Sequence, residues 1–281
     1  MKPHESRLGT RFSRTHPPVA VRKVLPGWRA DTPEAFLLAG RPPGTKYVVA
    51  CLGDSITQGQ ISANYVSLLR ARFGPAGTTF INAGVNGDLA FNVVNRLDAV
   101  IACRPDVVTL LVGTNDVNAR FDDTWAERYR KDQGLPVSPT LAWYVENIEA
   151  IVRRLQSETQ ARIALVEVPM LGEDLDGRMN GLVRAYNEAL HVAGKRLGVP
   201  CLPLYTRLES LFPAGHAPPP YAGDIKEILK AGMSSQLLRR SWDDIARRNG
   251  LVALTDHIHL SDRAASVVAD LVAGFLESEP G

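Results

Sequence analysis

The sequence predicts an α/β protein built on a parallel sheet of five strands. Five short apolar runs alternate with segments whose apolar residues recur at helical spacing, as strands and crossover helices do. Apolar runs of this kind are typical of strands in a sheet that helices cover on both faces. The chain has 281 residues, enough to bury one full core and leave some length for an extension or an insertion.

The composition narrows the class of protein and its partners. A hydrophobic content of 45% and a charged content of 22% are ordinary for a globular protein, and a net charge of +2 gives no support for a nucleic-acid or membrane partner. No apolar run approaches the roughly 20 residues of a membrane span, and residues 1–23 lack the apolar stretch of a secretory signal. The three cysteines, an odd number, lie in apolar segments and indicate buried free thiols. We therefore expect a cytoplasmic protein.

Residues 1–44 contain seven prolines and show little periodicity. We interpret them as an irregular N-terminal extension, which Trp28 and residues 36–38 could anchor to the body. A single domain at residues 45–281 follows.

The first strand–helix unit of this domain begins with the apolar run Val48–Leu52, which ends at Gly53. The helix that follows has Ser62 as its expected N-cap and Gly74 as its stop. The later units repeat this order, with strands expected at Thr79–Ala83, Val107–Val112, Arg162–Val168 and Pro200–Leu204. Helical spacing of apolar residues predicts helices at 91–101, 144–155, 182–197 and 261–275.

Three segments depart from this rhythm. Residues 117–140 are polar and are expected to form a loop. The prolines at positions 200 and 203 confine the fifth strand to an edge of the sheet. Residues 206–254 hold further prolines and two expected short helices, at about 225–238 and 241–248. We interpret this insertion as a cap or lid over the sheet edge, because it directly precedes Asp256.

Four loops that should meet at one edge of the sheet each carry a chemically distinct group. Ser55 follows the first strand, Gly87 the second and Asn115 the third, while Asp256 and His259 precede the last helix. Open α/β sheets place their ligands at the carboxyl ends of their strands. We therefore expect these residues to converge there, with Ser55 exposed at the edge.

These residue types are the parts of a nucleophilic serine site. A serine hydroxyl needs an imidazole to take its proton, and a carboxylate orients that imidazole. Asp256 and His259 are three residues apart, so one helical turn would put both on one side. The Ser55 N–H, the Gly87 N–H and the Asn115 amide could stabilise an oxyanion, each by roughly 3 kcal/mol.

The remaining polar residues near these loops have plainer interpretations. Asp54 and Asp116 are expected to accept hydrogen bonds from backbone N–H groups and hold their loops in a supporting role, and His257 is expected to face away from Ser55. A metal site at Asp256, His257, His259 and Asp262 is the less favoured reading, because no further ligand is evident. The segment 53–59 lacks the Gly-Lys-Ser/Thr ending of a phosphate loop, so no cofactor is expected.

The four loops resemble the sequence blocks of the SGNH or GDSL hydrolases. Gly53-Asp-Ser-Ile56, Asn82-Ala-Gly-Val-Asn-Gly-Asp88, Gly113-Thr-Asn-Asp116 and Asp256-His-Ile-His259 match the four blocks in order, between about Tyr47 and Phe275. The resemblance implies a flavodoxin-like three-layer α/β/α fold. It also implies ester hydrolysis through an acyl-enzyme, with Ser55, His259 and Asp256 as the catalytic residues and Ser55, Gly87 and Asn115 as the oxyanion donors. The N-terminal extension and the insertion depart from the family pattern.

The sequence thus predicts a cofactor-free serine esterase that acts on a small-molecule ester, with small acyl or acetyl esters favoured. An acyltransferase using the same residues is the alternative, in which the lid excludes water and admits an alcohol acceptor. A binding protein on the same fold that has lost turnover is a third hypothesis. The sequence leaves the ester and the oligomeric state open.

Overall fold

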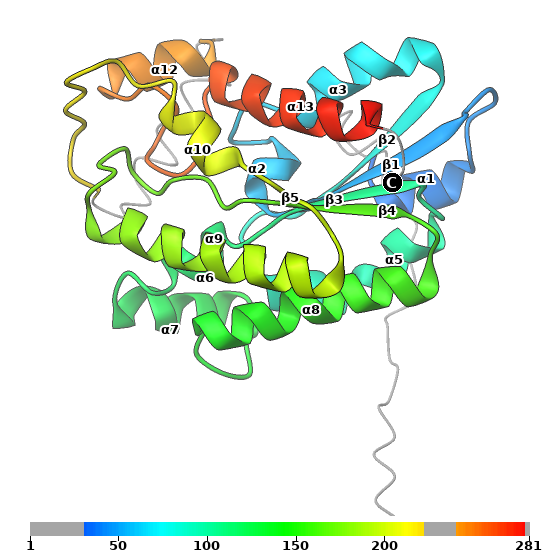
Figure 1. Ribbon diagram of the computed structural model, residues 1–281, viewed down its shortest axis with the longest axis horizontal. Coiled ribbons are helices and arrows are strands. Elements are labelled where there is room, and N and C mark those ends of the chain that lie inside the picture. The colour runs from blue at the N-terminus through cyan, green and yellow to red at the C-terminus, as the bar shows by residue number, and fades with distance from the viewer. Residues whose placement is uncertain (1–30, 222–239, 279–281) are drawn as a thin grey trace, which may run out of the picture.

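The computed structural model describes residues 31–221 and 240–278, and it contains a five-stranded sheet between two layers of helices (Figure 1). All strand pairs are parallel, in the order β2-β1-β3-β4-β5. The strands are β1 (Tyr47–Gly53), β2 (Thr78–Gly84), β3 (Val107–Leu111), β4 (Arg162–Val166) and β5 (Cys201–Leu202). The prediction of an α/β fold with five parallel strands is confirmed, and β5 lies at an edge of the sheet as expected, with β2 at the other edge.

The helices divide between the two faces of the sheet (Figure 1). One layer contains α3 (Tyr65–Phe73), α10 (Leu204–Glu209), α12 (Trp242–Arg248) and α13 (Asp262–Glu277). The other contains α4 (Ala90–Asn95), α5 (Leu97–Ala102), α6 (Thr114–Asn118), α8 (Leu141–Glu158) and α9 (Arg178–Leu197), with α7 (Asp123–Asp132) outside it. Covering both faces explains why the strands are apolar on both sides.

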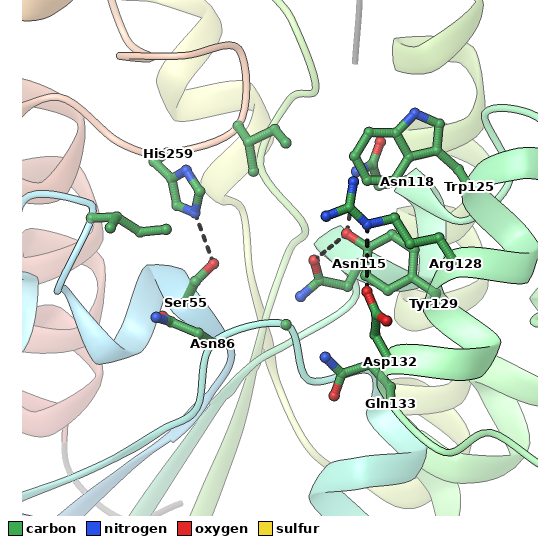
Figure 2. A pocket seen from close by; sticks show the side chains of 13 residues that line it. Ser55, Asn86, Asn115, Asn118, Trp125, Arg128, Tyr129, Asp132, Gln133 and His259 are labelled. Atoms are coloured by element: carbon green, nitrogen blue, oxygen red, sulfur yellow. Dashed lines mark hydrogen bonds and ion pairs between the residues drawn. The ribbon is translucent and has the colours of Figure 1, made fainter. Parts of the chain in front are cut away.

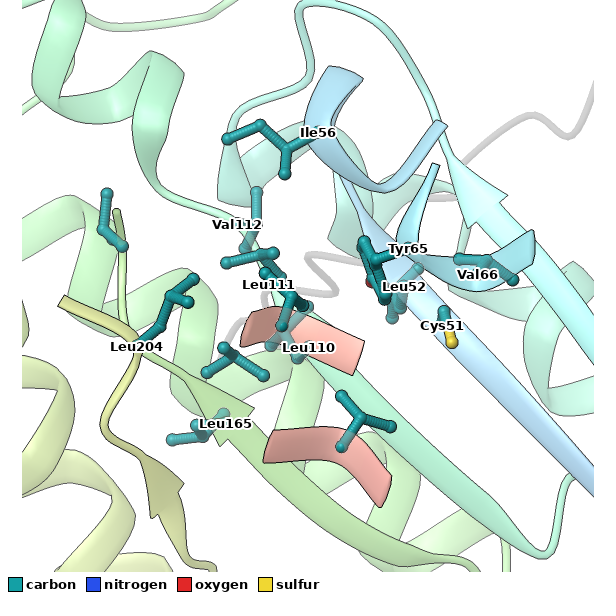
Figure 3. Close-up of a cluster of buried hydrophobic side chains, with 14 of the residues drawn as sticks. Cys51, Leu52, Ile56, Tyr65, Val66, Leu110, Leu111, Val112, Leu165 and Leu204 are labelled. Atoms are coloured by element: carbon teal, nitrogen blue, oxygen red, sulfur yellow. The ribbon is translucent and has the colours of Figure 1, made fainter. Parts of the chain in front are cut away.

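The core lies on both sides of the two central strands, β1 and β3. Every residue of β3 is buried, and so is every residue of β1 after Tyr47. Figure 3 shows Leu52 of β1 and Leu110 of β3 among the side chains that fill this core with Tyr65 of α3. Cys51 is fully buried there, and its burial raises the pKa of its thiol to about 12, which fits a packing role.

The expectation of an irregular segment at residues 1–44 is wrong for residues 33–39, which form a helix, while residues 40–44 have no regular secondary structure. Helix α1 (Pro33–Ala39) begins after Thr32, whose hydroxyl accepts a hydrogen bond from Ala35 N–H, and proline occupies its first position. Phe36 of this helix packs against the core, whereas Leu38 is 91% exposed and anchors nothing. Trp28 lies outside the described residues.

Helix α7 is a second correction, because the sequence predicted a loop across residues 117–140. Asp122 caps it by accepting a hydrogen bond from Trp125 N–H at 2.8 Å. No residue of α7 is fully buried, and its half-buried side consists of Trp125, Ala126 and Tyr129, too few apolar residues to produce the spacing by which helices are recognised.

Two helix boundaries also differ from the prediction. Asn64, not Ser62, caps α3, by accepting a hydrogen bond from Ser67 N–H at 2.9 Å. The single helix expected at 91–101 is divided at Arg96 into α4 and α5, and the Arg96 side chain reaches back to the ends of β1 and β2.

The insertion at residues 206–254 is described in part. The helix expected at 241–248 is α12, capped by Ser241, and the one expected at about 225–238 lies outside the described residues. That the insertion forms a lid stays a prediction.

Candidate active site

The turn after β1 presents Ser55 to the sheet edge. Asp54 caps the short helix α2 (Ser55–Gln58) by accepting a hydrogen bond from Ile56 N–H at 3.0 Å. Gly53 lies so close to β3 that an added Cβ would be 2.3 Å from the Leu111 carbonyl oxygen, so a side chain here would push the turn away. Ser55 is only 5% exposed, which corrects the expectation of an exposed serine: it lines a cavity instead.

Ser55, His259 and Asp256 form a continuous hydrogen-bonded chain. The Ser55 hydroxyl oxygen lies 2.9 Å from Nε2 of His259 (Figure 2). Nδ1 of the same ring lies 2.8 Å from Oδ2 of Asp256. His259 and Asp256 are each 3% exposed. The structure therefore brings Ser55 together with a pair of residues that lie some 200 positions later in the sequence, in the arrangement that a nucleophile, a base and an orienting carboxylate require.

The loop that carries Asp256 and His259 is a compact turn, not the expected helical turn. Leu254 and Leu260 pair in an antiparallel bridge, and Oδ1 of Asp256 accepts hydrogen bonds from the N–H groups of Ile258 and His259. Burial pushes the pKa of Asp256 up, but the His259 imidazole and these N–H donors outweigh it, so its pKa is lowered. Asp256 therefore stays a carboxylate that faces the imidazole.

Two neighbouring segments fix this loop from opposite sides. On the β1 side, the Ser62 hydroxyl accepts a hydrogen bond from Leu260 N–H at 3.1 Å, and Ala63 N–H donates to the Leu260 carbonyl. Beyond β4, the buried carboxylate of Glu173 accepts hydrogen bonds from three consecutive backbone N–H groups, at residues 252–254. His216 also lies 2.7 Å from Glu173. Sequence reasoning singled out neither Glu173 nor this role for Ser62.

Three N–H donors surround the cavity beside the Ser55 hydroxyl. In the part of the chain that the structure describes, neither the Ser55 N–H nor the Gly87 N–H has an acceptor. The Asn115 amide nitrogen donates one hydrogen to the Asp88 carbonyl at 2.9 Å, which leaves its second hydrogen for a bound carbonyl oxygen. Gly87 has φ +81°, and a Cβ there would lie 2.5 Å from the Gln133 side chain, so both conformation and space require glycine.

Arg96 ties the first two loops of the site together. Its guanidinium donates hydrogen bonds to the carbonyl oxygens of Gly53 and Ala83 and to the carboxylate of Asp88, the last at 2.6 Å. Burial raises the pKa of Asp88, and Arg96 opposes that shift. One side chain therefore sets the spacing between the Ser55 turn and the Gly87 turn.

Asp54 and Asp116 lie beneath the site and bind backbone groups. Asp54 caps α2, and Oδ2 of Asp116 accepts a hydrogen bond from Ala90 N–H at 3.1 Å. Burial raises the pKa of each carboxyl from 3.8 to about 7, and the charge of Asp54 raises that of Asp116 further. His257 packs edge-on against Tyr221 and does not line the cavity.

The cavity has a volume of about 170 Å³ and two unlike walls (Figure 2). Ile61 and Ile258 line it, as does His259. The opposite wall is α7 and its C-terminal turn, which contribute Trp125, Arg128, Tyr129, Asp132 and Gln133. Sequence reasoning missed this wall entirely. The one available signal was Asp122, an N-cap residue ahead of a polar helix.

The less favoured interpretation of the sequence was a metal site at Asp256, His257, His259 and Asp262. Within residues 31–221 and 240–278, no group of three or more His, Cys, Asp or Glu side chains is arranged to hold a metal ion. His259 is engaged by Ser55 and Asp256, and Asp262 accepts a hydrogen bond from Asp243 N–H.

No helix of the described chain has both the length and the apolar character needed to cross a bilayer.

Comparison with solved structures extends the fold assignment. An acetylxylan esterase from Geobacillus stearothermophilus superposes with a TM-score of 0.56 at 17% identity, over 84% of this chain and 96% of that one. A lipase/acylhydrolase from Enterococcus faecalis gives a TM-score of 0.55 at 18% identity, over 82% and 95% of the two chains. At these identities the likeness is one of fold, and it agrees with the three-layer α/β/α architecture.

Sequence comparison identifies the family of the chain. An acetylxylan esterase of Geobacillus stearothermophilus is 29% identical over 126 residues, which are 39% of this chain and 52% of the relative. The matched region thus spans about half the length of that curated relative. The model of the GDSL-like lipase/acylhydrolase family matches residues 51–229, well over half of the chain and including the loops of Ser55, Gly87 and Asn115. The chain therefore belongs to the GDSL-like lipase/acylhydrolase family.

Proposed function

We propose that this protein is a serine esterase that cleaves small acyl esters through an acyl-enzyme on Ser55. The observation that carries the proposal is the chain of hydrogen bonds from Ser55 through His259 to Asp256, at 2.9 and 2.8 Å, beside a cavity with three N–H donors. An unbonded serine hydroxyl is a weak nucleophile, and an adjacent imidazole held by a carboxylate is what activates it.

In the acylation step, His259 Nε2 takes the Ser55 hydroxyl proton as the oxygen attacks the ester carbonyl. Asp256 holds the other ring nitrogen, so the imidazolium that forms faces a carboxylate. The negative charge that develops on the carbonyl oxygen meets the N–H groups of Ser55 and Gly87 and the Asn115 amide. When the tetrahedral intermediate collapses, His259 donates the proton to the leaving alcohol and Ser55 carries the acyl group.

Deacylation repeats these roles with water as the nucleophile. His259 takes a proton from water as the oxygen attacks the acyl carbonyl, the same donors stabilise the second intermediate, and the proton returns to the Ser55 oxygen. The step uses residues already in contact. It needs no further group from the protein.

The size and lining of the cavity favour a small acyl group on a polar alcohol. Its volume of about 170 Å³ is below the roughly 300–1,000 Å³ of pockets that enclose drug-sized ligands. Trp125, Asp132 and Gln133 offer an aromatic ring, a carboxylate and an amide on the α7 wall, a combination that suits a ring bearing several hydroxyl groups. The relative named as an acetylxylan esterase adds support for an acetyl ester of a carbohydrate as the substrate class.

The test is turnover of p-nitrophenyl acetate by the wild type, Ser55→Ala and a control, Ser67→Ala, which removes an exposed serine of α3. We expect the rate of Ser55→Ala to fall by at least about 10³-fold and that of Ser67→Ala to stay at the wild-type value. Equal turnover by Ser55→Ala and the wild type would refute the proposal. Product analysis with an added alcohol acceptor distinguishes hydrolysis from acyl transfer, and labelling of Ser55 by a fluorophosphonate probe would exclude a protein that only binds.

The proposed location is the cytoplasm. The three cysteines are free thiols, and burial raises the pKa of each, which suits a reducing compartment. Fractionation of the native source, with detection by antibody, is the measurement that checks it.

A further inference from the structure

A line of four polar side chains runs behind the oxyanion side of the cavity. Tyr221 donates its hydroxyl hydrogen to Oδ1 of Asn118, and Nδ2 of Asn118 donates to the Tyr129 hydroxyl at 3.2 Å. The Tyr129 hydroxyl in turn donates to Oδ1 of Asn115 at 2.7 Å (Figure 2). The line ends where Nδ2 of Asn115 donates to the Asp88 carbonyl.

The direction of each bond in this line follows from its neighbours. Asn118 supplies an N–H to the Tyr129 oxygen, so the single Tyr129 proton is left for the Asn115 oxygen. If the Asn115 amide were turned over, its oxygen would face the Asp88 carbonyl, which is also an acceptor. Only one orientation of the Asn115 amide therefore satisfies both of its partners, and in that orientation its nitrogen lies toward the oxyanion position.

We propose that Tyr129 is a positioning residue for the oxyanion hole: it holds the Asn115 amide in the orientation that donates to the reacting carbonyl oxygen. The inference rests on the proposed esterase function. Tyr129 acts on the reaction through Asn115. Hydrogen bonds in series polarise one another, so the Tyr129 bond also makes the Asn115 N–H a stronger donor.

The properties of Tyr129 suit this role. Burial raises the pKa of its hydroxyl well above the ordinary value, so the group remains a hydrogen donor throughout the neutral range. This hydrogen bond also ties its helix, α7, to the site. The hydrogen bond that the Asn92 amide donates to the Gln133 carbonyl, at 3.0 Å, is another such tie.

The first test is Tyr129→Phe, which removes the hydroxyl and keeps the ring. We expect kcat for p-nitrophenyl acetate to fall about 10-fold with KM changed less than about twofold, because the donor is misplaced but still present. The matched control is Tyr186→Phe, since the buried Tyr186 hydroxyl has no hydrogen-bond partner among the described residues. We expect its kcat to be unchanged. Asn118→Asp is a second variant: it replaces the N–H that Tyr129 accepts with an acceptor, and it should also lower kcat.

A double-mutant cycle separates positioning from a general structural role. In an Asn115→Ala background, Tyr129→Phe should have no further effect on kcat, because there is no amide left to orient. An equal loss in both backgrounds, or no loss in the wild-type background, would overturn the inference. Its failure is distinguishable from failure of the proposed function: full activity of Ser55→Ala refutes the esterase assignment, whereas a dead Ser55→Ala with a fully active Tyr129→Phe refutes only the role of Tyr129.

Discussion

The two walls of the cavity are held in place by different means. The wall that carries Asp256 and His259 is buried, and backbone hydrogen bonds to Ser62, Ala63 and Glu173 fix it. The wall made by α7 buries no residue and meets the site through polar side chains such as Tyr129. The side that carries Asp256 and His259 is thus held by hydrogen bonds to backbone groups, while the α7 side is held by hydrogen bonds between side chains such as Tyr129 and Asn115.

The comparison predicts that damage to the two walls will have different kinetic signatures. Changes on the triad wall should remove proton transfer and lower kcat severely. Changes on the oxyanion side should weaken charge stabilisation and lower kcat by less. Changes to the supports of either wall should affect stability first.

The largest effect is expected from Asp256→Asn. An amide in place of the carboxylate cannot hold His259 in the correct tautomer or face its imidazolium, and by analogy with serine proteases kcat should fall about 10⁴-fold. Steady-state turnover of p-nitrophenyl acetate measures this. Asp262→Asn is the control, because within the described residues that carboxylate accepts a backbone hydrogen bond from Asp243 and does not contact Ser55 or His259, and it should keep wild-type activity. A fall of less than tenfold for Asp256→Asn would contradict the assigned role.

A smaller effect is expected from Asn115→Ala. Loss of one oxyanion donor should lower kcat by about 10²–10³-fold and leave KM nearly unchanged, since the donor acts on charge that develops in the transition state. Asn147→Ala is the matched control, because among the residues that the structure describes the Asn147 amide donates to the Trp143 carbonyl of its own helix, α8, and does not line the cavity. Equal effects of the two substitutions on kcat would remove Asn115 from the oxyanion hole.

The triad wall could be predicted from the sequence, and the α7 wall could not. The strands are apolar runs. Ser55 and Asn115 directly follow two of them, and Asp256 and His259 precede the last helix. Both the fold class and the convergence of these residues could therefore be predicted. Helix α7 is dominated by charged residues, so its sequence does not show the apolar spacing of a core helix, and no sequence pattern indicates that Tyr129 hydrogen-bonds to Asn115. The prediction that Ser55 is exposed was also wrong. Its burial depends on the two walls of the cavity, and their segments are not adjacent to Ser55 in the sequence.

A prediction on the support of the triad wall concerns Glu173→Gln. The Glu173 carboxylate receives three backbone N–H groups and His216, and an amide cannot satisfy all of them, so stability should fall by about 1–3 kcal/mol. Because the hydrogen bonds from residues 252–254 to Glu173 hold the loop that carries His259, we expect kcat to fall several-fold as well.

Glu167→Gln is the matched control for Glu173→Gln. Glu167 is also a buried glutamate paired with a histidine, His191, but its backbone partner is Tyr205, outside the site. Both variants should show a lower melting temperature, and only Glu173→Gln should lose activity per folded molecule. Equal activity in the two would show that the loop does not depend on Glu173.

The smallest effect concerns the pH dependence of stability. The pKa of Asp116 in the folded chain is about 7, raised by burial above the ordinary 3.8, so the folded state binds more protons than the unfolded state between these values. Stability contributed by this group therefore falls as pH rises through that window. Asp54, whose pKa is also raised to about 7, acts in the same direction, while Asp88 nearby is paired with Arg96.

Asp116→Asn removes this titration. The melting temperature of the variant minus that of the wild type should be more positive at pH 8 than at pH 5. The increase should be roughly 2–4 °C for each kcal/mol by which the raised pKa changes the free energy of unfolding. Asp270→Asn, at a side chain that is 68% exposed, should show no such pH dependence. A difference for Asp116→Asn that is the same at both pH values would contradict the raised pKa.

The central claim is that the acyl group is carried by Ser55, and trapping that intermediate tests it most directly. The wild type would be mixed with p-nitrophenyl acetate, quenched in acid during turnover and analysed by mass spectrometry of its peptides. The account predicts one acetyl group on Ser55 during turnover, and no acetylated peptide from Ser55→Ala. Steady turnover with no acyl group on Ser55, or with the acetyl group on another residue, would contradict it.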